Sequence, residues 1–237
     1  MTFVRLAGCN AAEVGLECVR WCDTPDSRET TAGRAMKVGD IMAQVRLPRL
    51  CLTGGEPLLQ LDGVAGLISA AAACRVVVHI ETNGTVSPLN GRVDGSSVAT
   101  RPIASRSKRS VDRLGDGIGA DRPVWMTVSP KPPAYLIAEG WEGLVDELKF
   151  VVDDGFDEAI AVRLAGEHPG AVVSIQPRSA PSLSAGATGL PVVGSAPLGC
   201  WSADGPTHEA VERAVDLVME HPDWRLSLQT HKLLGIR

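Results

Sequence analysis

A chain of 237 residues with 44% apolar and 22% charged residues is long enough to bury one full hydrophobic core. A formal net charge of −5 argues against nucleic acid as the main partner, because phosphate binding needs a basic face. We find no signal peptide and no apolar stretch that could span a bilayer, so the sequence predicts a cytoplasmic protein whose six cysteines stay reduced. Cys51 and Cys74 lie in apolar stretches and are predicted to be core residues.

The first notable feature is a cysteine-rich loop that follows a short apolar segment at Phe3–Leu6. It places Cys9, Cys18 and Cys22 within fourteen residues of chain. Three thiolates on one loop can bind three irons of a four-iron cluster and leave the fourth iron open to a reacting ligand. The alternative is a structural zinc site completed by a histidine or a distant cysteine. The spacing alone does not separate these two kinds of site.

The rest of the chain alternates predicted strands and helices, with two irregular stretches. Strands are predicted at Phe3–Leu6, Leu50–Leu52, Val76–Ile80, Val124–Val128, Glu147–Val152, Val172–Ile175 and Leu226–Leu228. Helices are predicted at Lys37–Val45, Leu58–Cys74, Phe156–Leu164 and Thr207–Glu220. Residues 85–123 and 178–203 are rich in Ser, Gly, Ala or Arg, and we expect both to be inserted flexible loops. The alternation predicts parallel β/α units in a single domain over residues 1–237.

Polar residues follow five of the predicted strands at the point where each strand ends. These groups are Thr53–Glu56, Glu81–Gly84, Ser129–Lys131, Gln176–Pro177 and Gln229–Lys232. In parallel β/α folds the ligand binds at the carboxyl ends of the strands. Each group alone is a weak signal, but five groups in the same structural position predict a binding site.

Together these segments resemble one enzyme family. The chain contains, in this order, the motifs GCN, CVRWCDT, TGGEP, ETNG, VSPK, ELKFVV, IQP and WRLSLQTHK. This order is similar to that of the 7-carboxy-7-deazaguanine synthases. These are radical S-adenosylmethionine enzymes of the queuosine, or 7-deazapurine, pathway. The resemblance implies an α/β fold, a partial (β/α) barrel of the radical S-adenosylmethionine type. It also implies a carbon–nitrogen lyase that converts 6-carboxy-5,6,7,8-tetrahydropterin to 7-carboxy-7-deazaguanine with loss of ammonia.

The resemblance also implies the cofactors and the residues that contact them. Cys9, Cys18 and Cys22 would hold a [4Fe–4S] cluster whose open iron binds S-adenosylmethionine, and Thr24 would be a ligand of Mg²⁺. The implied contacts to S-adenosylmethionine are Trp21, Asp23, Gly54, Gly55, Glu56, Glu81, Ser129, Pro130, Lys131, Gln176 and Pro177. The implied substrate contacts are Arg5, Thr53 and Arg237. No catalytic side chain is assigned, because the radical chemistry belongs to the cluster and S-adenosylmethionine.

The implied partners are a small pterin substrate and an electron donor such as flavodoxin, without nucleic acid or membrane, and a homodimer is left open.

Three features depart from the family pattern. The chain as given lacks the segment that precedes Phe3 in relatives, an N-terminal strand with a Gln-Gly-Glu-Gly stretch. We therefore expect it to bind S-adenosylmethionine but to convert the tetrahydropterin poorly or not at all. Three residues separate Cys18 from Cys22 where relatives have two, and Gly15 could absorb the extra residue through a positive φ. The third departure is the pair of irregular stretches.

Two other functions remain open at this point. One is a radical S-adenosylmethionine enzyme that acts on a different substrate. The other is a catalytically impaired relative that retained only the metal-binding scaffold.

Overall fold

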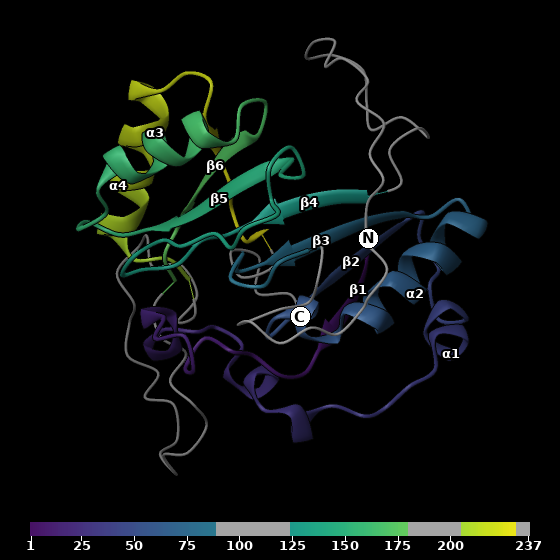
Figure 1. The fold of residues 1–237 in the computed structure, drawn as a ribbon. Coiled ribbons are helices and arrows are strands. Elements are labelled where there is room, and N and C mark those ends of the chain that lie inside the picture. Colours follow the sequence, from purple (N-terminus) through teal and green to yellow (C-terminus); the bar gives the residue numbers. More distant parts are fainter. Residues whose placement is uncertain (89–123, 180–204, 231–237) are drawn as a thin grey trace, which may run out of the picture.

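The computed structural model describes residues 1–88, 124–179 and 205–230 (Figure 1). Seven parallel strands form one open sheet in which every strand lies beside its neighbour in the sequence. The strands are β1 (Thr2–Leu6), β2 (Arg49–Gly54), β3 (Val77–Thr82), β4 (Val124–Val128), β5 (Glu147–Val152), β6 (Val172–Pro177) and β7 (Arg225–Leu226). β1 and β7 form the two edges and the sheet does not close, which confirms the predicted α/β fold with a partial barrel.

Four α-helices connect the strands. They are α1 (Val38–Met42), α2 (Leu61–Ala73), α3 (Glu158–Glu167) and α4 (His208–Glu220). Short 3₁₀ turns occur at Glu17–Arg20, Pro25–Arg28, Thr30–Ala32 and Pro57–Gln60. The predicted helix over 58–74 therefore starts as a separate 3₁₀ turn, and α1 is shorter than predicted. Thr207 caps α4, since its side chain accepts a hydrogen bond from the Ala210 backbone N–H.

The two faces of the sheet differ because successive side chains on a strand point to opposite sides. On one face, side chains such as Leu52, Ile80 and Phe150 are fully buried and form one core with the helices. Figure 1 shows α1 and α2 beside the first strands and α3 and α4 beside β5 and β6. The other set of positions carries polar side chains, among them Glu81 and Lys149. This second face holds the site described below.

Three details differ from the sequence-based predictions. Cys51 is buried as predicted, but Cys74 is exposed, because α2 ends at Ala73 and Cys74 is its C-cap residue. The first predicted loop begins later than expected, since Val86 is buried and its carbonyl accepts a hydrogen bond from Trp141 Nε1 at 3.1 Å. At the second stretch, Ser179 forms a β-bridge with Pro206. The rest of both predicted loops lies outside the described residues, so their flexibility stays a prediction.

No helix among the described residues is long and apolar enough to cross a membrane.

The contact between Trp141 and Val86 yields a test of where the first loop begins. Trp141→Phe keeps most of the fully buried ring but leaves the Val86 carbonyl without its donor. We expect the free energy of unfolding to fall by about 1–3 kcal/mol, the usual effect of an unsatisfied buried polar group. Chemical denaturation measures this change. A loss below about 0.5 kcal/mol would show that Val86 is not part of the packed structure.

Candidate active site at the carboxyl ends of the strands

One cavity gathers most of the residues that the sequence singled out. It lies where the cysteine loop meets the carboxyl ends of the central strands. Its lining includes Cys9, Cys18, Trp21, Cys22, Asp23, Thr24, Thr53, Gly54, Gly55, Glu81, Ser129, Lys131 and Gln176. The strand ends and the cysteine loop therefore come together as the parallel topology predicts.

Four of the predicted site residues do not line this cavity, and a fifth is not described by the structure. Glu56 is fully buried and does not line the cavity, and neither do Pro130 and Pro177. Arg5 is exposed on β1, where it lies directly beside Thr53 of β2 in the parallel register. Arg237 lies outside the described residues.

The cysteine loop is held by its own backbone. Cys9 N–H donates to the Arg28 carbonyl at 3.0 Å, so the start of the loop is tied to its end. Cys18 lies in the 3₁₀ turn Glu17–Arg20, and its carbonyl accepts from Trp21 N–H at 3.1 Å. Gly15 has a φ of +72°, the conformation expected if this loop absorbs an additional residue. These contacts bring the three sulfurs to one cavity despite their unusual spacing.

The three thiols are free and half-buried in this structure. Burial raises the pKa of Cys9, and it raises the pKa of Cys18 to about 11, although the Lys131 cation opposes the rise at Cys18. The negative charges of Glu56 and Cys22 also raise the pKa of Cys9, and those of Cys9 and Cys22 raise the pKa of Cys18. A metal bound by Cys9 and Cys18 would therefore have to displace their protons.

Cys9, Cys18 and Cys22 all line this one cavity. Among the described residues, no set of three or more His, Cys, Asp or Glu side chains forms a ready-made site for a single metal ion.

The Gly-Gly pair at the end of β2 lies against the start of the cysteine loop. Gly55 N–H donates to the Leu6 carbonyl at 3.0 Å, and Glu56 N–H donates to the Gly8 carbonyl at 2.8 Å. Gly54 has a φ of +140°, and a Cβ there would lie 2.1 Å from the Leu6 oxygen. A Cβ on Gly55 would lie 2.0 Å from the Gly8 oxygen. Glycine is thus required here by the close approach of two backbone segments.

Glu56 connects the end of β2 to the end of β3. Its carboxylate accepts hydrogen bonds from Leu58 N–H at 2.9 Å, Thr82 Oγ1 at 2.8 Å and Asn83 N–H at 2.7 Å. Burial raises the pKa of Glu56, and these three donors oppose the rise. The sequence placed this residue among the cofactor contacts, but its carboxylate faces the protein.

Asn10 extends this network into the cysteine loop, and sequence reasoning missed it. Its Oδ1 accepts from Asn83 Nδ2 at 3.1 Å, and its Nδ2 donates to Thr85 Oγ1 at 2.8 Å. Asn10 is almost fully buried directly after Cys9. The polar residue after a cysteine was visible in the sequence, but its partners lie more than seventy residues away.

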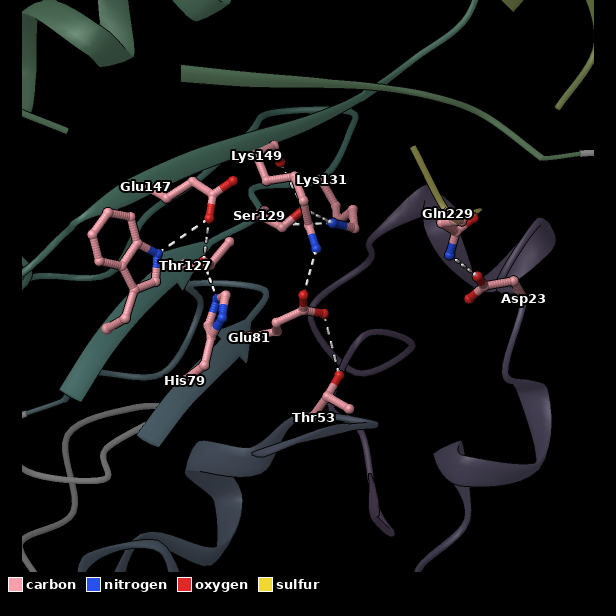
Figure 2. A network of polar contacts seen from close by, with 11 residues as sticks. Asp23, Thr53, His79, Glu81, Thr127, Ser129, Lys131, Glu147, Lys149 and Gln229 are labelled. Carbon is pink, nitrogen blue, oxygen red and sulfur yellow. Dashed lines mark hydrogen bonds and ion pairs between the residues drawn. The ribbon is translucent and has the colours of Figure 1, made fainter. Parts of the chain in front are cut away.

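An ion pair crosses the cavity wall between β3 and β5 (Figure 2). Lys149 Nζ lies 2.9 Å from Glu81 Oε1, and Thr53 Oγ1 donates to Glu81 Oε2 at 3.5 Å. Burial alone would raise the pKa of Glu81, but the Lys149 ammonium holds it below the usual value. Lys149 is another residue that the sequence-based assignment missed. A lysine inside the apolar strand ELKFVV was the available signal.

A second cation, Lys131, lies near Lys149 after β4 (Figure 2). Lys131 Nζ donates to the Ser129 carbonyl at 2.7 Å and also to Ser129 Oγ. Ser129 Oγ in turn donates to the Lys149 carbonyl at 2.7 Å. Burial lowers the pKa of Lys131 to about 8, and the negative charges of Cys18, Glu81 and Asp23 favour its charged form.

A glutamine closes the site between the two edges of the sheet (Figure 2). Gln229, which follows β7, donates through Nε2 to Asp23 Oδ2 at 2.9 Å and accepts through Oε1 from Ser179 Oγ at 3.0 Å. Asp23 belongs to the cysteine loop that follows β1. One amide thus joins the cysteine loop to the last segment of the described chain.

Comparison with known proteins agrees with this arrangement. The chain is 31% identical to the 7-carboxy-7-deazaguanine synthase of Bordetella pertussis over 251 residues, covering 99% of this chain and 88% of the relative. It is 33% identical to that of Bacteroides thetaiotaomicron over 240 residues, covering 99% and 87%. The crystal structure of QueE from Escherichia coli superposes with a TM-score of 0.56 at 19% identity, covering 96% of this chain and 84% of that one, and supports the fold. No protein-family model matches the chain.

An open parallel sheet with a three-cysteine loop at the carboxyl ends of its strands defines a radical S-adenosylmethionine type of enzyme. Within that class, the near-full-length similarity is to a single kind of enzyme. The chain belongs to the 7-carboxy-7-deazaguanine synthase family.

The close contact at Gly55 can be tested by one pair of variants. Gly55→Ala places a methyl group against the Gly8 carbonyl, so we expect the free energy of unfolding to fall by about 1–3 kcal/mol. Gly63→Ala is the control, since a Cβ there has nothing within 4 Å. The control should be neutral or slightly stabilising, because alanine is the better helix former. Thermal or chemical denaturation of both variants provides the comparison, and equal effects would contradict this account of the glycine pair.

The Gln229 contact predicts a local effect on the cysteine loop. Gln229→Glu sets a second carboxylate against Asp23, so the loop should detach more often and its backbone amides should exchange faster with deuterium. Gln44→Glu is the control, because Gln44 is exposed and its side chain donates to the Asp40 carbonyl of its own segment. Unchanged exchange over residues 18–24 in the Gln229 variant would show that the contact does not hold the loop.

Proposed function

We propose that this chain converts 6-carboxy-5,6,7,8-tetrahydropterin to 7-carboxy-7-deazaguanine with loss of ammonia, using a [4Fe–4S] cluster and S-adenosylmethionine. The observation that carries the proposal is the cavity in which Cys9, Cys18 and Cys22 meet the ends of the central strands. Family membership supports the same reaction. A bound cluster and S-adenosylmethionine would supply the one-electron radical chemistry.

The donor set fits such a cluster. Three thiols and no fourth cysteine line the described part of the cavity, which leaves one iron open for a small ligand. The charges beside the thiols suit S-adenosylmethionine, which carries an ammonium, a carboxylate and a sulfonium. Glu81 and Asp23 offer negative charge, while Lys131 and Lys149 offer positive charge. The role of the protein is to bind and orient this mixed-charge ligand and to shield the site from water.

Each charged side chain is held in place before the ligand arrives. Lys149 fixes one oxygen of Glu81, Ser129 fixes Lys131, and Gln229 fixes Asp23. Such preorganised groups lose little conformational entropy when the ligand binds. The exposed backbone of Gly54 and Gly55 completes the wall on the side of the cysteine loop.

We also propose that Thr24 would be a ligand of Mg²⁺, which would help to hold the substrate carboxylate. Its side chain lines the cavity, and Oγ1 lies 3.8 Å from Cys22 Sγ. Magnesium often keeps several waters and takes only one or two protein oxygens plus substrate. Thr24→Val should therefore weaken the magnesium dependence of turnover, while Thr24→Ser keeps a hydroxyl and should retain it. Equal magnesium dependence in both variants would remove Thr24 as a ligand.

The remaining partners follow from the reaction. The substrate is a small pterin whose carboxylate could pair with Arg5 beside Thr53. Arg237 stays a proposed substrate contact. The electron would come from a one-electron donor such as flavodoxin, and a homodimer is left open.

The cysteine assignment is tested by two variants at one position of the loop. Cys18→Ala should prevent assembly of a full cluster during anaerobic reconstitution, because only two thiolates remain at the cavity. The double variant Cys18→Val with Val19→Cys restores the two-residue gap of the family and should assemble the cluster at least as well as the original chain. Iron content and the paramagnetic spectrum of the reduced protein measure both. A full cluster in Cys18→Ala that responds to S-adenosylmethionine would show that the third ligand lies elsewhere.

The reaction itself is tested by its products. Reconstituted chain, S-adenosylmethionine, reductant and the tetrahydropterin should give 7-carboxy-7-deazaguanine, detected by mass spectrometry. Cleavage of S-adenosylmethionine without this product, at any pterin concentration, would indicate a radical enzyme with a different substrate. The absence of both reactions from cluster-bearing protein would indicate a binding protein.

A further inference from the structure

A second polar network lies on the same face of the sheet, toward the amino-terminal side of the cavity (Figure 2). His79 Nε2 lies 2.7 Å from Thr127 Oγ1, and Thr127 Oγ1 lies 2.7 Å from Glu147 Oε2. The Trp125 indole N–H donates to the same Glu147 oxygen at 3.2 Å. His79 is two residues before Glu81 on β3, and side chains two apart on a strand share a face. The network thus lies on the same face of the sheet, directly beside the Glu81–Lys149 pair that lines the cavity.

The direction of these hydrogen bonds follows from Glu147. Burial alone would raise the pKa of Glu147, but the donors Ser174, Thr127 and Trp125 hold it below its usual value. The ionised carboxylate only accepts hydrogen bonds, so the single proton of the Thr127 hydroxyl is directed toward it. The Thr127 oxygen must then accept from His79, and His79 carries its proton on Nε2.

This leaves Nδ1 of His79 with a lone pair and no partner among the described residues. Within these residues, the one fully buried side-chain nitrogen or oxygen without a partner belongs to His168, so Nδ1 of the half-buried His79 is not fully buried. Burial lowers the pKa of His79, which keeps the ring neutral at neutral pH. Two neighbours supply apolar surface beside this acceptor. They are Cys51, which pairs with His79 across β2 and β3, and Trp125, whose ring meets the imidazole edge to face at 6.5 Å.

We propose that His79 is a substrate-binding residue whose Nδ1 accepts a hydrogen bond from a ring N–H of the bound heterocycle. The proposal rests on the proposed function, since a reduced pterin offers several ring N–H donors. Glu147 and Thr127 are positioning residues that act through His79 by fixing its tautomer. A half-buried three-residue chain that sets one tautomer and leaves the other nitrogen without a partner is the arrangement expected of a ligand acceptor.

His79→Gln separates this role from a structural one. The glutamine amide can still donate to Thr127, but it places no imidazole nitrogen at the position of Nδ1. With the cluster-bearing protein, we expect the dissociation constant of 6-carboxy-5,6,7,8-tetrahydropterin to rise about 2- to 10-fold, as for one lost hydrogen bond. Thr127→Val should weaken binding in the same direction, and Thr127→Ser should restore it. The affinity for S-adenosylmethionine should stay unchanged in all three, as it should in the control His208→Gln on the exposed surface of α4.

The pH dependence gives a second readout. The charged groups around His79 are Glu81 on its own strand, Glu147 and Lys149 on β5, and Asp146 before β5. Protonation of Nδ1 removes the acceptor. Because the pKa of His79 lies below the ordinary 6.5, pterin affinity should be complete at neutral pH and fall as the pH drops through that lowered pKa. This loss should be absent in His79→Gln.

The possible outcomes are distinct. An unchanged pterin affinity and an unchanged pH profile in His79→Gln would overturn the inference and leave the proposed function intact. Failure of the unsubstituted, cluster-bearing chain to bind the pterin would overturn both. Weaker pterin binding with unchanged binding of S-adenosylmethionine would support the inference, while equal loss for both ligands would show that His79 is only structural.

Discussion

The buried carboxylate of Glu56 joins the three pieces of chain that form the cavity. Its own backbone N–H binds the Gly8 carbonyl at the start of the cysteine loop, and its side chain binds Thr82 and Asn83 at the end of β3. A carboxylate without water needs such donors, because each unsatisfied buried polar group is costly. The Gly-Gly turn beside it permits the close approach of β1 and β2. The position of the thiols therefore depends on contacts that never face the ligand.

The polar face of the sheet carries charged and polar side chains in successive positions along the strands. Lys131 and Asp23 line the cavity together with the thiols. The Glu81–Lys149 pair comes next along the strands, and the network around His79 lies beyond that pair. The mixed signs suit a ligand with charges of both kinds near the cluster. The neutral imidazole suits an uncharged ring with N–H donors. The proposed binding sites of the cofactor and of the heterocycle thus lie beside each other along one face.

Local sequence patterns predicted the fold well, because apolar runs and turn residues determine where a strand ends and which residues follow it. They placed Thr53, Glu81 and Ser129 correctly at one cavity. They could not give the partners of Asn10 or Lys149, since those contacts join segments 73 and 68 residues apart. Glu56 looked like a ligand contact for the same reason, because burial is decided by packing between distant segments and not by the neighbouring residues.

The central claim is that three thiolates hold a cluster whose fourth iron is open to S-adenosylmethionine. The most direct measurement is electron–nuclear double resonance on the reduced, reconstituted chain with S-adenosylmethionine labelled by ¹⁵N at the amino group and ¹⁷O at the carboxylate. We predict hyperfine couplings from both labels, because the two groups would bind the open iron. Absence of both couplings in a protein that carries a full cluster would show that a fourth ligand closes the site, and would contradict this account.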